Sequence, residues 1–321
     1  MISVVIPCFQ EEEALPALVV RLRPVLDGLD EPYEVVFVDD GSQDGTWRVL
    51  GELAAHWPEV RCLRLGRNSG HQAALTAGLD VADGHWVVTM DADLQDPPEL
   101  IPEMVRVARE NAVEVVYARR KDRSSDPRFK RGTANLYYSL MRRLAEVEVP
   151  RHVGDFRLLS RRVVMALRHL PDHNRVYRLL IPWLGYPSAV VEHVRDPRVA
   201  GVTKYSVKKM TVLAVTSLTT FSTSPLRIAT ATGLAIGAVS VAMSVWALAA
   251  YVLGGTVPGW ASTVIPVYFL GAVQLSCIGV LGEYLGRVFQ QVQGRPAYHV
   301  VADSASSEAC QPAQLPETNS A

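Results

Sequence analysis

The sequence predicts an α/β domain with a mostly parallel sheet, followed by an amphipathic segment and two membrane-spanning helices. Over residues 1–120, short runs rich in valine and isoleucine alternate with helix-length segments, as in sheets covered by helices on both faces. A more basic and less regular region follows, to about residue 225. Residues 228–282 then contain no charged side chain and no histidine, which is typical of membrane spans.

Five strands are expected in the first region, because the runs are apolar on both faces and are separated by helix-length segments. They lie at residues 2–6, 33–39, 60–65, 85–90 and 113–117. Open parallel sheets bind ligands outside the carboxyl ends of their strands. Acidic side chains fall at two of these ends: Asp39 and Asp40 after the second strand, and Asp91, Asp93 and Asp96 after the fourth.

Residues 1–203 are expected to form one domain, whose second part, from about residue 120, supplies the opposite side of a cleft. Helix-like patterns occur in this part near 129–146 and 159–169. Residues 204–225 mix apolar residues with three lysines, a pattern that suits a juxtamembrane helix lying on an anionic lipid surface. An ordinary amphipathic core helix is an equal alternative for this segment.

Two spans are expected at about 227–253 and 261–285, within a membrane region of residues 226–290, because a spanning helix needs about 20 apolar residues. The alternative is a buried hairpin of a soluble protein, which rarely sustains so long a charge-free run. Basic residues precede the first span and follow the second, and the connecting loop is uncharged. The positive-inside rule therefore predicts a multi-pass protein of the cytoplasmic membrane, with the first domain and both termini in the cytosol.

The two ends of the chain carry simpler signals. The N-terminal residues read as a first strand, because they lack the basic and long apolar segments of a secretory signal. Residues 291–321 are expected to form a cytosolic tail that is mostly disordered after about residue 302.

The four cysteines show no metal-type spacing, and the net charge of -1 gives no basic field that would attract nucleic acid.

The acids after the fourth strand have the pattern of a cation site. Asp91 and Asp93 stand at alternate positions, on one side of an extended backbone, and Gln95 follows two residues later. Hard divalent cations such as Mg²⁺ and Mn²⁺ take oxygen ligands and keep open positions for substrate phosphates. These three residues are the expected metal ligands. A turn or helix cap is the alternative for an isolated pair of this kind, and Asp96 is read as the N-cap of the helix that follows.

The acids after the second strand, in V-D-D-G-S-Q-D-G-T, can accept hydrogen bonds from the base and ribose of a nucleotide. Asp39 is favoured over Asp40 for this role. Ser42 or Asp44 is equally suited to capping the next helix. The chain has no G-x-G-x-x-G motif after the first strand and no G-x-x-x-x-G-K-[ST] motif, so the dinucleotide-binding and P-loop classes lose their main support.

Four blocks occur in the order V-I-P-C-F-Q-E-E-E, V-D-D-G-S-Q-D-G-T, R-N-S-G-H and D-A-D-L-Q-D-P-P-E. Together they resemble the family 2 glycosyltransferases with the GT-A (Rossmann-like) fold, and most of all the branch that includes polyprenyl-phosphate hexosyltransferases and dolichyl-phosphate mannose synthases. The later blocks V-Y-A-R-R-K-D-R, G-D-F-R-L, G-V-T-K-Y-S and G-E-Y-L-G-R extend the resemblance to about residues 1–300. The last block and the two spans are similar to bacterial enzymes that glycosylate undecaprenyl phosphate.

The resemblance implies a set of roles. The nucleotide half is about residues 1–120, with nucleotide-binding residues Pro7, Glu11, Asp39, Asp40 and Asp91. Mg²⁺ or Mn²⁺ is held by Asp91, Asp93 and Gln95 and neutralises the leaving diphosphate, so Asp93 counts as catalytic. Asp155 is the other catalytic candidate, either as a base or as a residue that orients the acceptor, with a purely structural role as the alternative.

A dianionic acceptor must approach a dianionic donor, so cations are also needed. The expected phosphate-binding residues are Arg120, Arg123, Arg131, Arg157 and Lys204, because guanidinium groups make two-pronged phosphate contacts. A solvated surface charge is the alternative for each, and an ion pair with Asp155 is the alternative for Arg157. His71 is read as structural, and Glu283 and Arg287, one helical turn apart, are expected to form a pair.

The expected reaction is a metal-dependent, inverting transfer of one hexose from a nucleotide sugar to a polyprenyl (undecaprenyl) phosphate. UDP-glucose is the favoured donor, and GDP-mannose is the alternative. A single transfer is expected, because two spans are few for a processive synthase and the Q-x-x-R-W block is missing. A silent membrane scaffold that binds nucleotide sugars is the alternative from another class. A homo-oligomer and a lipid-sugar flippase are expected partners by analogy only.

Overall fold

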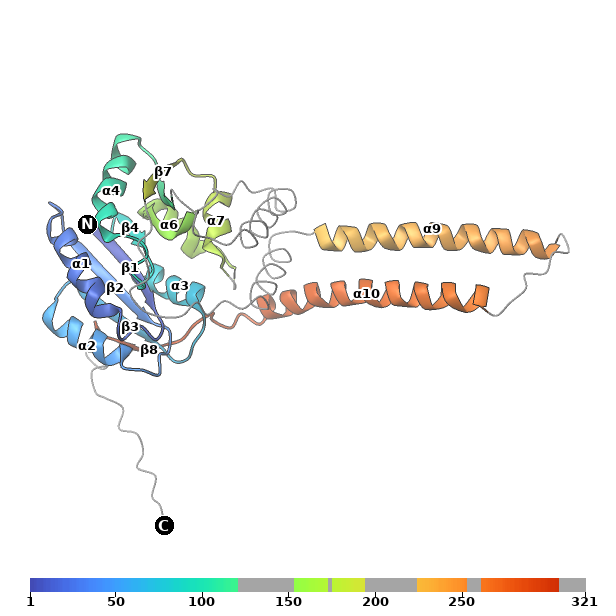
Figure 1. Cartoon of the computed structure of the whole chain (residues 1–321), viewed down its shortest axis with the longest axis horizontal. Helices are drawn as coiled ribbons and strands as arrows, with labels where there is room; N and C mark the ends of the chain where they lie inside the picture. Colours follow the sequence, from blue (N-terminus) through green and yellow to red (C-terminus); the bar gives the residue numbers. More distant parts are fainter. Residues whose placement is uncertain (121–152, 173–174, 194–223, 253–260, 306–321) are drawn as a thin grey trace, which may run out of the picture. The chain divides into compact units, whose positions relative to one another are not determined.

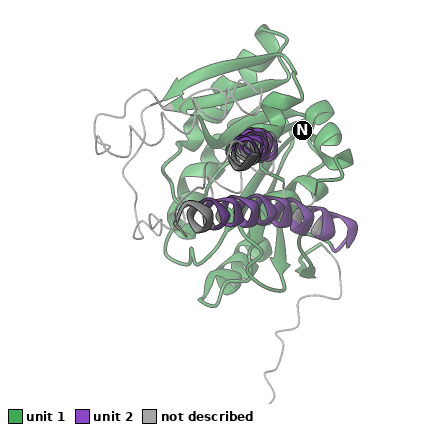
Figure 2. Cartoon of the chain, turned by 90° about the vertical axis from the view of Figure 1, so that its right-hand side faces the viewer, with its two compact units in different colours: residues 1–138, 147–204, 296–321 green, residues 139–146, 205–295 purple. Residues whose placement is uncertain are grey.

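The computed structural model describes residues 1–120, 153–172, 175–193, 224–252 and 261–305 (Figure 1). These residues fall into two compact units, which are coloured separately in Figure 2. The first unit holds the described residues up to 193 and those from Pro296 onward, and the second holds the long helices between them. The predicted helix at 129–146 and the juxtamembrane segment at 204–225 lie outside the described residues.

The first unit is built on an eight-stranded sheet with the order β7-β5-β6-β4-β1-β2-β3-β8. The strands are β1 (Ile2–Cys8), β2 (Tyr33–Asp39), β3 (Val60–Leu65), β4 (Trp86–Thr89), β5 (Val115–Arg120), β6 (Val153–Ser160), β7 (Ser188–His193) and β8 (Val300–Asp303). β1 pairs in parallel with β2 and β4, β2 pairs in parallel with β3, and β5 pairs in parallel with β7. β6 and β8 run antiparallel to their neighbours. The predicted α/β class with a mostly parallel sheet is confirmed.

Helices follow the strands along the chain. They are α1 (Leu15–Asp27), α2 (Thr46–His56), α3 (His71–Val81), the 3₁₀ turn η1 (Pro98–Leu100), α4 (Ile101–Glu110), α6 (Arg161–His169) and α7 (Tyr177–Trp183). α1 buries Leu15, Leu18, Leu22 and Leu26, the spacing of one helical face. In α3, Gly78 allows a close approach to the sheet, because a Cβ there would lie 2.3 Å from Val5 Cγ1.

The five predicted strands are all present, within three residues of the expected bounds, and the helix predicted near 159–169 is α6. The sequence did not predict β6, β7 or β8. Residues from about 302 were assigned to a disordered tail, but Ala302 and Asp303 belong to β8 and pair with β3. An ion pair of 2.7 Å between Arg61 Nη2 and Asp303 Oδ2 fastens this strand. The prediction of disorder from about residue 302 is therefore wrong for Ala302 and Asp303.

The second unit contains α9 (Ser224–Val252) and α10 (Ala261–Val292), where two spans were predicted. Cys277 Sγ of α10 lies 3.6 Å from the carbonyl oxygen of Ala229 in α9, so the helices are in contact. Over the described residues, one window, Phe269–Gly286, is long and apolar enough to cross a membrane, with a mean hydropathy of 1.4. The described apolar stretch of α9, Ala229–Val239, is shorter. The second span is therefore not confirmed.

Candidate active site

The candidate site lies at the carboxyl ends of the parallel strands, where the loops after β1, β2, β3 and β4 meet. His71, the first residue of α3, stands between two carboxylates. Its Nε2 atom lies 3.3 Å from Asp155 Oδ2 and 3.6 Å from Asp91 Oδ1. The side chains of His71 and Asp91 are 40% and 37% exposed, so this meeting point is accessible to a substrate.

The loop that presents His71 is held by Asp40. The two oxygens of this buried carboxylate accept hydrogen bonds from the backbone N–H groups of Ser69 and Gly70, at 2.7 and 2.9 Å. Gly70 adopts a φ of 96°, a conformation that glycine adopts at little cost. A Cβ on Gly41, which has a φ of 67°, would lie 2.6 Å from the carbonyl carbon of Arg67. The D-D-G-S and R-N-S-G-H blocks therefore pack together as one unit.

Asp155 and Arg157 form an ion pair on β6. They are two residues apart, on the same side of the strand, and Arg157 Nη2 donates hydrogen bonds to Asp155 Oδ1 and to the Gly154 carbonyl oxygen. The Arg157 side chain is only 1% exposed. Burial raises the pKa of Asp155, but the charge of Arg157, the hydrogen bond from His71 and the charge of Arg178 outweigh it. The pKa of Asp155 is held well below its ordinary range, so this residue is a carboxylate and a weak base.

Asp91 has the opposite electrostatic environment. Burial raises its pKa to about 6, helped by the negative charges of Asp155, Asp96 and Asp93 and opposed by His71. Burial lowers the pKa of His71, but the hydrogen bond to Asp155 and the charges of Asp91 and Asp155 outweigh it and raise the pKa to about 9. The cluster of carboxylates is thus short of positive charge, as expected of residues that bind a cation.

The residues expected to hold a metal fit such a group chemically. Their carboxylate and amide oxygens are the ligands that Mg²⁺ and Mn²⁺ prefer. Among the described residues, Gln95 Oε1 is buried without a hydrogen-bond partner, which leaves one oxygen available. Within the same part of the chain, no three His, Cys, Asp or Glu residues are grouped closely enough to hold a metal ion by themselves.

The backbone of this loop is strained. Leu94, between Asp93 and Gln95, has a φ of 58°, a left-handed conformation that costs a non-glycine residue roughly 1 kcal/mol or more. Its side chain is buried in the core, which keeps it in place. Asp96 does not cap the following turn: its Oδ1 atom lies 3.3 Å from His193 Nε2, and both side chains are buried. The cap interpretation of Asp96 is therefore wrong.

The predicted nucleotide residues lie at the same edge of the sheet. Pro7 is opposite Val38 in the β1–β2 register, and the backbone N–H of Glu11 donates to Thr46 Oγ1 at 2.9 Å. Asp39 is fully buried, and its Oδ1 accepts the N–H of Ser42 at 2.9 Å. Its Oδ2 lies 3.4 Å from Arg64 Nε. Asp39 thus has internal partners, and Arg64 is a nearby cation that the sequence did not single out.

The structure describes only some of the residues that were predicted to bind the acceptor phosphate. Arg157 lies at the site, whereas Arg120 ends β5 and its side chain is not described. Arg123, Arg131 and Lys204 lie outside the described residues, and so does the side chain of Arg287. Arg178 on α7 was missed, although its positive charge lowers the pKa of both Asp155 and Arg157. A single arginine in an apolar helix gives no sequence signal for such a position.

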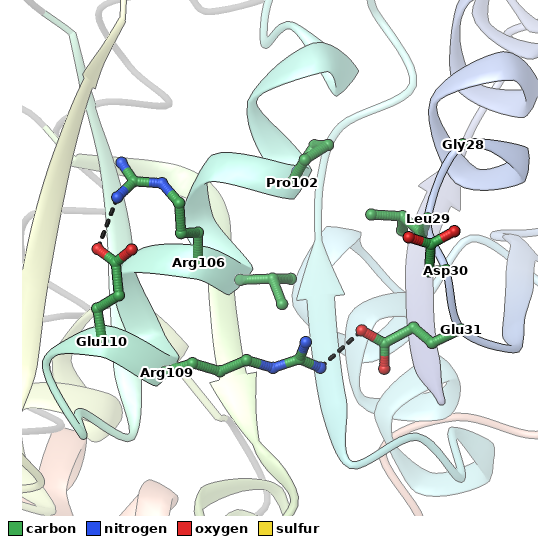
Figure 3. Close-up of a pocket in the computed structure, with 9 residues that line it drawn as sticks. Gly28, Leu29, Asp30, Glu31, Pro102, Arg106, Arg109 and Glu110 are labelled. Atoms are coloured by element: carbon green, nitrogen blue, oxygen red, sulfur yellow. Dashed lines mark hydrogen bonds and ion pairs between the residues drawn. The ribbon is translucent and has the colours of Figure 1, made fainter.

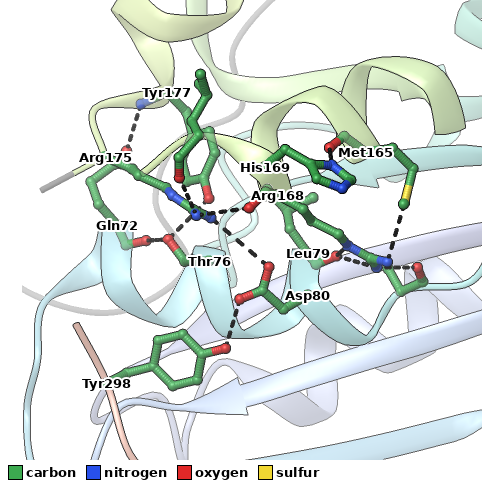
Figure 4. A network of polar contacts seen from close by, with 12 residues as sticks. Gln72, Thr76, Leu79, Asp80, Met165, Arg168, His169, Arg175, Tyr177 and Tyr298 are labelled. Atoms are coloured by element: carbon green, nitrogen blue, oxygen red, sulfur yellow. Dashed lines mark hydrogen bonds and ion pairs between the residues drawn. The ribbon is translucent and has the colours of Figure 1, made fainter. Parts of the chain in front are cut away.

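A network of polar contacts fixes α3 away from the site (Figure 4). Gln72 Oε1 accepts the backbone N–H of Tyr177 at 3.1 Å, and the Tyr177 hydroxyl donates to Thr76 Oγ1 at 3.0 Å. Asp80 Oδ2 accepts a 2.7 Å hydrogen bond from the hydroxyl of Tyr298. The helix is therefore anchored to α7 and to the segment that leads into β8.

A separate cavity of about 500 Å³ lies between the end of α1 and α4 (Figure 3). Two of its charged pairs are Arg109 with Glu31 and Arg106 with Glu110, each at 2.6 Å. Glu31 lies in the turn that leads into β2, so this cavity is at the amino ends of the strands. Ligand sites of such sheets lie at the opposite edge, and we do not assign the chemistry to this cavity.

The mostly parallel α/β sheet with acidic loops at its carboxyl edge has the arrangement of the GT-A fold. Residues 3–168 match the family model described as Glycosyl transferase family 2. The chain belongs to that family.

Relatives of known sequence extend over nearly the whole chain. The SfII prophage-derived bactoprenol glucosyl transferase of Shigella flexneri is 42% identical over 298 residues, which cover 92% of this chain and 96% of that protein. An uncharacterized glycosyltransferase of Synechocystis sp. is 41% identical over 300 residues, covering 93% of this chain and 94% of that protein.

A solved structure supports the fold. The glucosyl-3-phosphoglycerate synthase from Mycobacterium tuberculosis, crystallised with Mn²⁺, uridine diphosphate and phosphoglyceric acid, has a TM-score of 0.51 at 22% identity. The likeness covers 68% of this chain and 76% of that chain. At this identity it supports the arrangement of helices and strands and not the substrate.

Proposed function

We propose that this chain transfers one glucose from UDP-glucose to undecaprenyl phosphate, with inversion at the anomeric carbon and with Mg²⁺ or Mn²⁺. The observation that carries the proposal is the meeting of Asp91 and Asp155 at the carboxyl edge of the sheet. It occurs in a chain similar over 92% of its length to a bactoprenol glucosyl transferase. The product is a membrane-bound sugar donor.

On the donor side, Asp91, Asp93 and Gln95 would hold the cation beside the donor diphosphate. The cation, when bound, supplies a Lewis acid that stabilises the departing nucleoside diphosphate. Pro7, Glu11 and Asp39 line the nucleotide position at the ends of β1 and β2. Asp40 acts indirectly, because both of its oxygens hold the loop that carries His71.

On the acceptor side, the nucleophile is an oxygen of the lipid phosphate. The second pKa of a phosphomonoester is about 6, so the acceptor is largely deprotonated at neutral pH. This oxygen forms a bond to the anomeric carbon, while the bond from that carbon to the diphosphate breaks and its electron pair leaves with the nucleoside diphosphate. Attack from the opposite side converts an α-linked donor into a β-linked product.

Asp155 orients the acceptor in this scheme and does not remove a proton. Its pKa is held well below the ordinary range by Arg157 and His71, against the effect of burial, so it is a poor base. Arg157 neutralises the carboxylate, and Arg120, Arg123, Arg131 and Lys204 are the proposed ligands of the acceptor phosphate. In this proposal α10, with α9 as the second span, anchors the chain in the cytoplasmic membrane with the catalytic domain in the cytosol, and the positive-inside pattern of the sequence supports that orientation.

The test is transfer of radiolabelled sugar to undecaprenyl phosphate by the full chain in detergent. UDP-glucose is compared with GDP-mannose, each with Mn²⁺ and with a chelator. We expect a lipid-linked product from UDP-glucose only, lost with the chelator and in Asp93→Asn. A product from GDP-mannose alone would show that GDP-mannose, and not UDP-glucose, is the donor. Binding of UDP with no product from any donor would favour a silent scaffold.

A further inference from the structure

We propose that His71 is a positioning residue of the transfer reaction, whose Nε2–H group fixes the Asp155 carboxylate beside the metal-side acid Asp91. The inference rests on the function proposed above. Both neighbours of Nε2, at 3.3 and 3.6 Å, are carboxylate oxygens that accept hydrogen bonds. This nitrogen therefore carries a proton, which it donates to Asp155, the nearer of the two.

The Asp155 carboxylate has two partners, and His71 is one of them. One carboxylate oxygen accepts from Arg157 Nη2, and the other faces His71 Nε2. Arg157 belongs to the same strand as Asp155, so that contact ties the carboxylate only to its own strand. His71 comes from α3 and supplies a second, independent point. Two partners on two elements fix the plane of the carboxylate.

Several residues hold the loop that positions His71. Asp40 is buried, and both of its oxygens hold the N–H groups of the two residues just before it. Gly70 supplies the positive φ and Gly41 the room for the loop. The His71 side chain lies beside Asp91 and Asp155, yet 40% of it stays exposed. This placement is better explained by an interaction at the site than by a contribution to the hydrophobic core.

α3 does not depend on His71 for its own position. Gln72 and Thr76 bind Tyr177, and Asp80 binds Tyr298 (Figure 4). Substitution of His71 is therefore expected to leave the helix in place. Its effect should appear in the alignment of Asp155 and not in the stability of the fold.

The experiment compares His71→Ala, His71→Gln and a matched control, His169→Gln, in the full chain. His169 is an exposed histidine whose Nδ1 lies 2.7 Å from a carbonyl oxygen of its own helix. For each variant, kcat and KM for both substrates are measured, with the Kd for UDP and Mn²⁺ by calorimetry and the Tm. For His71→Ala we expect kcat to fall by about 100-fold, the scale of a misplacement near 1 Å, with the Kd and Tm close to wild type.

His71→Gln should recover a large part of the rate, because the glutamine amide also offers an N–H donor near the Nε2 position, and His169→Gln should match wild type. A kcat of His71→Ala within twofold of wild type would overturn the inference. So would a Kd for UDP and Mn²⁺ weakened as much as kcat, which would mean donor contact, or a glutamine variant as inactive as the alanine one. An inactive wild type that still binds UDP would count against the proposed function instead.

Discussion

Removing the charge of Arg157 should destabilise the first unit by about 3 kcal/mol. The Asp155 side chain is only 17% exposed and Arg157 only 1%, so Arg157→Met leaves a carboxylate with poor access to water. The variant loses a charged hydrogen bond to Asp155 and a second one to the Gly154 carbonyl. Such bonds contribute about 2 and about 1 kcal/mol. The total agrees with the roughly 3–5 kcal/mol cost of breaking a buried pair, since His71 still contacts Asp155.

The assay is urea unfolding of the full chain in a mild detergent, followed by tryptophan fluorescence. The double variant Asp155→Asn, Arg157→Met removes both charges, so it should cost about 1–3 kcal/mol less than the sum of the single variants. A cost of Arg157→Met below about 1 kcal/mol, or strict additivity in the double variant, would refute the reasoning.

The same pair predicts the pH dependence. The pKa of Asp155 is lower in the folded chain than in the unfolded one. The stabilisation is therefore fully present above about pH 4, the ordinary aspartate pKa, and is lost as the pH falls below it. The difference in stability between wild type and Arg157→Met should shrink in that range, and a difference that grew on acidification would contradict the assigned sign.

Three further substitutions test the fold, each by the same unfolding assay. Ala112→Gly should stabilise the chain by about 0.5–1 kcal/mol, because Ala112 is exposed and has a φ of 50° that glycine adopts freely; a loss of stability would contradict this. Gly78→Ala should destabilise it by about 1–3 kcal/mol through its contact with Val5, and an unchanged midpoint would mean that the helix shifts freely. Tyr298→Phe should cost about 1 kcal/mol by removing the hydrogen bond to Asp80, and no change would mean that water replaces it.

The central strands could be predicted because their apolar pattern is local. β1 is buried along its whole length, and its run of apolar residues predicts this burial. β6 was missed because Asp155 and Arg157 interrupt its apolar run, and their burial becomes intelligible only when they pair. β8 was missed because it has four residues and no stability without β3. The local sequence pattern carries no information on pairing partners that are distant in sequence.

The site divides in the same way. Asp91 and Asp93 could be proposed as cation ligands from the sequence, because such oxygen ligands can stand close together in one loop. His71 was read as structural, since its partners come from the loop after β4 and from β6. The nucleotide role predicted for Asp40 stays a prediction, and nothing in D-D-G-S reveals that its oxygens also accept the N–H groups of Ser69 and Gly70. The spacing of residues along the sequence does not reveal side chains whose partners lie in other segments of the chain.

These contacts bear on how the enzyme divides its acids. Asp91 and Asp155 share one histidine, yet burial dominates the pKa of Asp91 and raises it, while Arg157 and His71 lower the pKa of Asp155 despite burial. A carboxylate with a raised pKa gains most from an added positive charge, so Asp91 is the better cation ligand. Under the proposed function, a carboxylate already neutralised by a buried arginine could stand beside the anionic acceptor without repelling it strongly. In that scheme Asp91 would bind the cation and Asp155 would face the acceptor, and the two acids differ in the partners that set their pKa values.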